Sequence, residues 1–150
     1  MRNLNKPGFR KVDMHIHTPV SICYSEKSAT AEEIVFTAIA SGLEAIAVTD
    51  HNTAAAIDDI RQIAGRNGLE TNQPRQVKMK IHDSQYLSAL EITIPQNRKL
   101  WNEGKVRGYP KKYACIQGSD AHAPAEIGRR PVYIQMDQIG LAALRAAFMD

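Results

Sequence analysis

The feature that most constrains the fold is a pair of histidines at the end of a predicted β-strand. Residues 12–17 alternate between apolar and polar side chains, which is the period of a half-buried strand, and Thr18-Pro19 ends the run. Side chains two positions apart in a strand share a face, so His15 and His17 can reach one metal ion. If the pair binds a metal ion, the fold must bring further ligands to the carboxyl end of this strand; the alternative is a pair of surface histidines.

The next elements alternate between helix and strand. Thr30 and Glu33 have the spacing of a capping box, so we expect a helix from there to Gly42. Residues 45–48 form a short apolar run, typical of a strand in a parallel sheet that is covered on both faces. An amphipathic pattern predicts a second helix over 53–66. The rhythm of strand and helix indicates an α/β protein.

The second half of the chain has a weaker pattern. We expect a loop over 69–80, an irregular basic stretch over 96–112 and a closing helix over 137–148. Strand patterns recur at 85–94, 113–117 and 131–136, which brings the expected number of strands to about five. His82 is expected to be an exposed loop residue.

Four segments end in residues that commonly bind metal ions. In chain order, these candidate ligands are His15, His17, Asp50, His51, Glu91, Asp120 and His122. Active sites of α/β sheets and barrels are built at the carboxyl ends of the strands. Mixed imidazole and carboxylate ligands suit Zn, Mn or Fe, and Mg is also admitted. These groups exceed what one ion can use, so we expect about two or three divalent metal ions.

Composition excludes several classes of protein. The 150 residues fit one domain, and 43% hydrophobic and 23% charged residues exclude a disordered or fibrous chain. The net charge of +3 is too small to indicate a nucleic-acid partner by itself. Two cysteines are too few for a disulfide framework, and no apolar run reaches the roughly 18 residues of a membrane span. We therefore expect a cytoplasmic protein with no membrane partner.

Four motifs, in order, resemble those of the PHP (polymerase and histidinol phosphatase) domain family. They are Asp-Met-His-Ile-His at 13–17, Val-Thr-Asp-His-Asn at 48–52, Leu-Glu-Ile-Thr at 90–93 and Gly-Ser-Asp-Ala-His at 118–122. The resemblance implies a single PHP domain over 1–150, folded as a distorted, TIM-like (β/α)7 barrel. It also implies a metal-dependent phosphoesterase, either a nuclease or a nucleotide phosphatase, in which a metal-bound hydroxide attacks the phosphate ester.

The resemblance also implies a role for each candidate ligand. His15 and His17 would bind one ion, and Glu91 would bridge ions. A trinuclear site would be completed by His51, Asp120 and His122.

Further residues have expected roles near these ligands. Asp50 would be a ligand or would support one, and with Arg129 it is a candidate catalytic residue. Arg129 and Arg130 follow the last motif closely; one of them can clamp a substrate phosphate through two hydrogen bonds, and the other is expected to be structural. Cys23, six residues after His17, lies where the family varies and is a further candidate ligand.

The chain departs from the family pattern in two ways. Further histidine ligands follow the bridging Glu in the family, but no histidine lies between Glu91 and His122. A barrel of seven strand–helix units needs more than about 200 residues. Either the domain is shortened, or residues are missing from the sequence around 69–86 and 95–112.

The C-terminal part suggests a larger context. Residues 125–130 and the strand and helix after them are most similar to PHP domains at the N-terminus of SMC- or AAA-like ATPases. We therefore expect the N-terminal part of a longer, ATPase-linked chain, or a partner ATPase in the same complex.

Two other functions stay open. The absent histidines also fit a catalytically degenerate, metal-stabilised regulatory module. Residues 98–112 carry six basic side chains and one acidic side chain, with Trp101 and Tyr109 between them. This stretch fits a nucleic-acid-binding module of an ATPase that contacts DNA or RNA. Alternatively, residues 98–112 form a solvated loop or a face that docks a partner domain.

Overall fold

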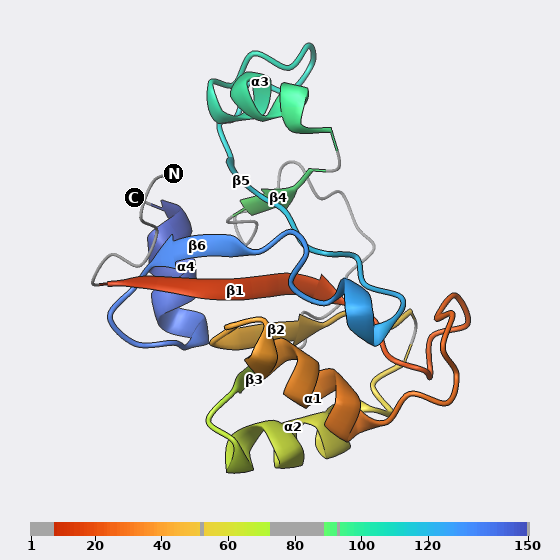
Figure 1. Ribbon diagram of the computed structural model, residues 1–150. Helices are drawn as coiled ribbons and strands as arrows, with labels where there is room; N and C mark the ends of the chain where they lie inside the picture. Colours follow the sequence, from red (N-terminus) through yellow and green to blue (C-terminus); the bar gives the residue numbers. More distant parts are fainter. Residues whose placement is uncertain (1–7, 52, 73–88, 93, 150) are drawn as a thin grey trace.

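The computed structural model describes residues 8–51, 53–72, 89–92 and 94–149 (Figure 1). Its main sheet has the strand order β3-β2-β1-β6. The strands are β1 (Phe9–Ile16), β2 (Ala45–Val48), β3 (Glu70–Asn72) and β6 (Val132–Gln135). The first three are parallel, whereas β6 runs antiparallel to β1. The parallel sheet predicted from residues 45–48 is confirmed, and an antiparallel strand lies at one edge.

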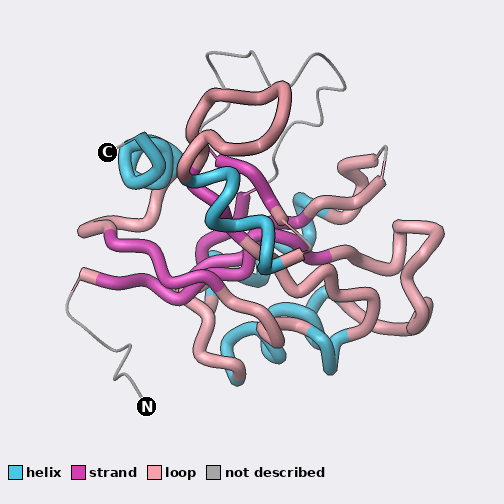
Figure 2. Tube along the Cα trace, turned by 90° about the horizontal axis from the view of Figure 1, so that it is seen from above, coloured by secondary structure: helices cyan, strands magenta, loops and turns pink. Residues whose placement is uncertain are grey.

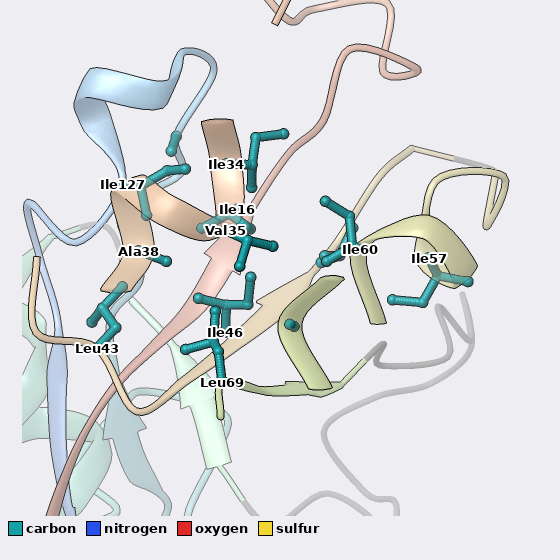
Figure 3. Close-up of a cluster of buried hydrophobic side chains, with 13 residues drawn as sticks. Ile16, Ile34, Val35, Ala38, Leu43, Ile46, Ile57, Ile60, Leu69 and Ile127 are labelled. Carbon is teal, nitrogen blue, oxygen red and sulfur yellow. The ribbon is translucent and has the colours of Figure 1, made fainter. Parts of the chain in front are cut away.

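Helices α1 (Ala31–Ala40) and α2 (Ile57–Arg66) cover one face of this sheet. Figure 3 shows their apolar side chains meeting those of the strands in one buried cluster. Its fully buried members include Ile16, Ile34, Val35, Ile46 and Ile60. The predicted capping box starts α1, because Glu33 N donates to Thr30 Oγ1 at 3.2 Å and Thr30 N donates to Glu33 Oε2 at 2.9 Å.

Helix α4 (Leu141–Met149) packs on the opposite face. Its residues Leu144 and Phe148 lie against a cluster built on Val12, Ile134 and Met136. Seen from above, α4 stands beside the strands near the C-terminus (Figure 2). The main sheet is therefore a middle layer between helices.

The first strand changes register just before the histidine pair. Val12 pairs with Ala45 and Ile16 with Val48, so β1 holds one residue more than β2 over the same length. Such irregularities re-aim side chains. Val12 packs in the cluster with α4, whereas Ile16 packs with α1 and α2. The strict alternation predicted over 12–17 is wrong here, because the extra residue moves Ile16 to the other face.

A smaller sheet pairs β4 (Ala89–Glu91) with β5 (Ala114–Ile116) in parallel. Between them lie the turn η2 (Pro95–Asn97) and helix α3 (Arg98–Asn102), which project away from the main sheet in Figure 1. A last turn, η3 (Pro124–Glu126), follows β5. The prediction that residues 96–112 are irregular is therefore only partly confirmed, because this stretch contains α3.

Other boundaries also differ from the sequence predictions. The loop predicted over 69–80 is wrong at 70–72, which pair with β2 as β3. The helix predicted from 53 begins only at Ile57, because the Thr53 hydroxyl accepts a hydrogen bond from Ala55 N and forms a turn. The closing helix begins at Leu141 rather than at residue 137.

The described ranges contain six strands in two sheets, and within them the sheets do not close into a barrel. His82 and the motif residues Asn52 and Thr93 lie outside these ranges. No helix in the described part of the chain is both long and apolar enough to cross a membrane.

Candidate metal centre

Three of the four sequence motifs meet at the carboxyl end of β1. Asp120 N donates to His15 O at 2.9 Å, so the segment 118–122 runs alongside the strand. His17 N donates to Ala121 O at 3.0 Å. On the other side, Thr49 N donates to the last carbonyl of β1 at 2.8 Å. These backbone hydrogen bonds bring the predicted ligands of all three motifs to one edge of the sheet.

Gly118 allows the close approach of this segment to β1. A Cβ atom at position 118 would lie 2.3 Å from His15 Cβ and 2.8 Å from His15 N. No side chain fits at such distances, whereas glycine lets two backbones approach. The Gly-Ser-Asp-Ala-His motif therefore begins with the residue that the contact requires.

Asp13 is a buried carboxylate that ties these segments together. It is 0% exposed; its Oδ1 accepts from Ser119 N at 2.9 Å and its Oδ2 from Gly128 N at 2.9 Å. The sequence predictions did not include Asp13 among the site residues. Its place two residues before His15, on the polar side of the alternation, is the signal that could have found it.

The donor atoms of His15, His17 and Asp120 converge. Nε2 of His15 lies 3.1 Å from Nε2 of His17, and Asp120 Oδ1 lies 3.3 Å from each nitrogen. Asp120 has a φ of 52°, in the left-handed region that residues other than glycine rarely adopt. Such strain persists where the surroundings hold it, often at functional sites. Two imidazoles and one carboxylate are a donor set that fits Zn, Mn or Fe.

Glu91 contacts the far side of the His15 ring. Its Oε2 lies 2.5 Å from His15 Nδ1, and this hydrogen bond raises the pKa of His15. A carboxylate on Nδ1 orients an imidazole so that Nε2 is presented to the ion. Glu91 is not part of the donor group of His15, His17 and Asp120. The geometry thus favours an orienting role over the bridging role that the resemblance implies.

His17 lies at the centre of the histidine cluster and is 1% exposed. Its burial lowers its pKa, and the neighbouring His15, His122 and His51 lower it further. The ring centroid of His17 lies 4.7 Å from that of His51 and 4.6 Å from that of His122. A neutral imidazole keeps the lone pair that metal coordination needs.

His122 is held through its ring and its backbone. Its Nδ1 lies 2.8 Å from the carbonyl oxygen of Asp120 and donates to it, which leaves Nε2 as the ring nitrogen that can bind a metal ion. His122 N donates to Glu126 Oε2 at 2.7 Å, and this hydrogen bond lowers the pKa of Glu126. His122 therefore faces His17 in a fixed tautomer.

Arg129 forms hydrogen bonds with residues close to the candidate ligands. Its Nε donates to Ser119 O at 2.9 Å, and its guanidinium pairs with Glu126 Oε1 at 2.6 Å. Arg130 also donates to Ser119 O, at 2.9 Å. These contacts favour a positioning role for Arg129 over the phosphate clamp predicted from the sequence, because each of its three guanidinium nitrogens bonds to Ser119, Asp120 or Glu126.

Asp50 is buried and holds the loop after β1. Its Oδ1 accepts from Thr18 N at 2.7 Å and from Ser21 Oγ at 2.6 Å, and its Oδ2 accepts from Thr18 Oγ1 at 2.7 Å. Oδ1 is 4.0 Å from Nδ1 of His17. Both oxygens are thus engaged behind His17, which favours a supporting role over that of a ligand or catalytic group.

A second donor group consists of His17, Cys23 and His51. One donor atom from each lies within 4.8 Å of the other two. Cys23 and His51 are exposed, whereas His17 is buried. Because His17 belongs to both groups, the two candidate sites adjoin.

Comparison with known proteins agrees with this architecture. The PHP domain family matches residues 13–106, which is more than half of the 150 residues. The matched range contains His15, His17, His51 and Glu91, and the 118–122 segment follows it. No curated protein and no solved structure matches the chain. The chain belongs to the PHP domain family.

Proposed function

We propose that this chain is a metal-dependent phosphoesterase that hydrolyses phosphomonoesters or phosphodiesters. Members of the PHP domain family are generally metal-dependent hydrolases. The observation that carries the proposal is the pair of Nε2 atoms of His15 and His17, 3.1 Å apart with the Asp120 carboxylate beside them. The three donor atoms lie within 4.8 Å of one another, close enough for one cation to bind all three.

The chain's own residues supply the rigidity that such a site needs. Divalent ions held there would polarise the phosphoryl group, activate water and neutralise charge on the leaving oxygen. Glu91 fixes the ring of His15, and Asp50 fixes the loop behind His17. Asp13 and Gly118 keep the segment that carries Asp120 against β1. A metal site held in this way keeps its geometry through turnover.

Hydrolysis of p-nitrophenyl phosphate and bis(p-nitrophenyl) phosphate with Mn²⁺ or Zn²⁺ tests the proposal. We expect His15→Ala and Asp120→Ala to lower kcat/KM by about 100-fold or more, because each removes a group that would hold the ion. Asp59→Ala, which removes an exposed carboxylate on α2, is the matched control and should keep full activity. Equal activity in all four proteins would overturn the proposal. A melting temperature that falls on chelation, without turnover of either ester, would instead support the regulatory module.

A nucleic-acid substrate is favoured by the basic segment, residues 98–112. Its side chains include Lys99 and Lys105, which are 81% and 67% exposed. Trp101 forms a ring contact with Tyr109 at 5.8 Å, and Lys111 Nζ lies 4.9 Å above the ring of Tyr113. Cations interleaved with aromatic rings can follow a phosphate backbone and stack on bases.

The basic segment adjoins the strand that leads to the segment 118–122. A cavity of about 450 Å³ is lined by Arg98 from this segment and by Gln117, which directly precedes Gly118. A polyanion on the basic segment would therefore lie close to the strand that leads to Asp120. This proximity favours a nuclease over a nucleotide phosphatase.

Binding of single-stranded DNA at several salt concentrations tests this second step. Arg107→Glu/Lys112→Glu should weaken binding and flatten the dependence on salt, because fewer counterions are released. Arg61→Glu/Arg66→Glu makes the same charge change on α2 and should leave binding unchanged. Equal losses in both variants would mean that net charge, rather than the basic segment, attracts the DNA.

Several expectations remain predictions from the sequence. Among them are the association with an SMC- or AAA-like ATPase, the cytoplasmic location and a third metal ion. Co-purification with an ATPase after expression in the native host would support the first of them.

A further inference from the structure

The loop that carries Cys23 is fastened to the segment after β2 that carries His51. Thr18 and Ser21 bond to the Asp50 carboxylate, and His51 N donates back to Ser21 Oγ at 3.2 Å. These hydrogen bonds join residues about thirty positions apart, at the point where β1 and β2 both end. The first half of the loop therefore cannot move without moving His51.

The second half of the loop is fastened to the 118–122 segment. Ser25 N and Ser25 Oγ donate to the carbonyl of His122 at 2.8 and 2.7 Å. Tyr24 N donates to Ser21 O at 3.1 Å, and Lys27 Nζ also donates to the Ser21 carbonyl. Cys23 thus lies between two anchored points, Ser21 and Ser25, and its position relative to the histidines is set.

The thiol of Cys23 is close to two imidazoles and accessible from solvent. Its Sγ and the donor nitrogens of His17 and His51 lie within 4.8 Å of one another. Cys23 is a free, exposed cysteine. The other cysteine, Cys115, lies in β5 with its thiol near the carbonyls of Arg98 and Tyr113. Only one of the two thiols therefore faces candidate ligands among the described residues.

The two donor groups differ in chemical softness. The group with Asp120 combines imidazoles with a carboxylate, which suits Mn²⁺, Fe²⁺ or Zn²⁺. Thiolate ligands favour Zn²⁺ and other thiophilic ions over Mn²⁺ and Mg²⁺, which prefer oxygen. We propose that Cys23 binds a metal ion as a thiolate, together with His51, and makes this half of the centre selective for Zn²⁺. On binding, the S–H bond breaks, the proton passes to solvent and sulfur donates its electron pair to the ion.

The experiment uses Co²⁺ as a spectroscopic substitute for Zn²⁺. Metal-free protein titrated with Co²⁺ should develop a near-ultraviolet sulfur-to-cobalt charge-transfer band, which imidazole and carboxylate ligands do not produce. Cys23→Ser should abolish the band, whereas Cys115→Ser, the matched control, should keep it. Zn²⁺ competition should show a dissociation constant at least about tenfold higher in Cys23→Ser. No band in the wild type, or a band that survives Cys23→Ser, would overturn the proposal.

Thiol alkylation gives a readout that needs no variant. Zn²⁺ should protect Cys23 from iodoacetamide, while Mg²⁺ should not, and mass spectrometry of the peptides distinguishes Cys23 from Cys115. Equal protection by both ions would contradict the selectivity. The inference rests on the proposed function only because both place a metal ion at the carboxyl end of β1. A cobalt band without phosphoester turnover would support the thiolate site and reject the phosphoesterase. Turnover without the band would support the phosphoesterase and reject the thiolate site.

Discussion

The segments of the candidate metal centre are held together by a buried carboxylate, whereas the carboxylate of the basic segment pairs with lysines at the surface. At the metal centre, Asp13 is fully buried and accepts hydrogen bonds from the backbone of three segments. In the basic segment, Glu103 is 36% exposed and pairs with Lys99 and Lys105, which reach far into solvent. A buried carboxylate fixes geometry because losing it leaves donors without partners, whereas an exposed one is replaced by water.

This difference separates two tasks within one chain. The centre around His17 is built where the backbone is closely packed and where the core cluster of α1, α2 and the main sheet supports it (Figure 3). The basic segment stands on the small β4–β5 sheet, with its charges exposed. Chemistry that needs fixed donor distances suits the first region, and attraction of a polyanion suits the second.

The largest expected effect comes from Asp13→Asn. An asparagine has one acceptor oxygen, so Ser119 N or Gly128 N would lose its partner and face an NH₂ group. We expect the free energy of unfolding to fall by about 3 kcal/mol. Urea denaturation measures it, and Asp59→Asn on the exposed side of α2 is the control. A loss as small as that of the control would mean that buried hydrogen bonds do not set the two regions apart.

Gly118→Ala should have the next largest effect. The new Cβ would meet the His15 backbone, so the segment 118–122 must move away from β1, at a cost of about 2 kcal/mol. Gly65→Ala is the control, because the Cβ at this helical position meets open space and should add up to about 1 kcal/mol of stability. Thermal unfolding measures both. Opposite shifts are expected, and a stabilised Gly118→Ala would contradict the close packing of the centre.

Arg129→Ala distinguishes a positioning residue from a phosphate clamp. Loss of the bonds to Ser119 O and Glu126 should loosen Asp120 and raise the dissociation constant for Mn²⁺ by about tenfold. Isothermal titration with the metal alone measures this. An unchanged metal affinity, with only KM raised, would restore the clamp predicted from the sequence.

Tyr24→Phe should have a smaller effect that depends on pH. Tyr24 is 2% exposed and its hydroxyl finds no hydrogen-bond partner among the described residues. Phenylalanine removes this buried polar group, so stability should rise by up to about 1 kcal/mol. Burial raises the pKa of Tyr24 to about 12 from its ordinary value of 10.0.

The direction of that shift sets the pH profile. The folded protein binds the phenolic proton of Tyr24 more tightly than the unfolded chain does. This difference contributes stability that is fully present below pH 10 and is lost as the pH rises toward 12. Wild-type stability should therefore fall more steeply above pH 10 than that of Tyr24→Phe. Melting curves at closely spaced pH values measure this, and parallel profiles would count against a buried hydroxyl.

Glu103→Gln should have the smallest effect, below about 0.5 kcal/mol, because exposed ion pairs contribute little. It neutralises one carboxylate, as Asp13→Asn does, so urea denaturation of the two variants compares the two regions directly. At the same time the variant should bind single-stranded DNA slightly more tightly, since it removes the acid from the basic segment. A stability loss equal to that of Asp13→Asn would contradict the contrast between the buried and the exposed carboxylate.

Local sequence patterns predicted much of the main sheet and its helices. The capping box at Thr30 and the apolar run 45–48 appear as predicted, because both depend on neighbours within a few residues. Strand β3 was missed because residues 70–72 carry no apolar pattern and become a strand only by pairing with β2. The register shift in β1 was also missed, since it depends on the length of the partner strand.

By itself, the sequence determined which residue types gather at the candidate centre. His15, His17, His51 and Asp120 follow strand patterns that end at a common edge, and strand periodicity is a local property. Only the tertiary structure decided which of them converge. In the structure Asp50 contacts Thr18, Glu91 contacts the His15 ring and Arg129 contacts Ser119. Asp13 and Cys23 lie against residues from distant segments. The reason is physical: hydrogen bonds between segments far apart in sequence select one role for each group, and these bonds have no local signature.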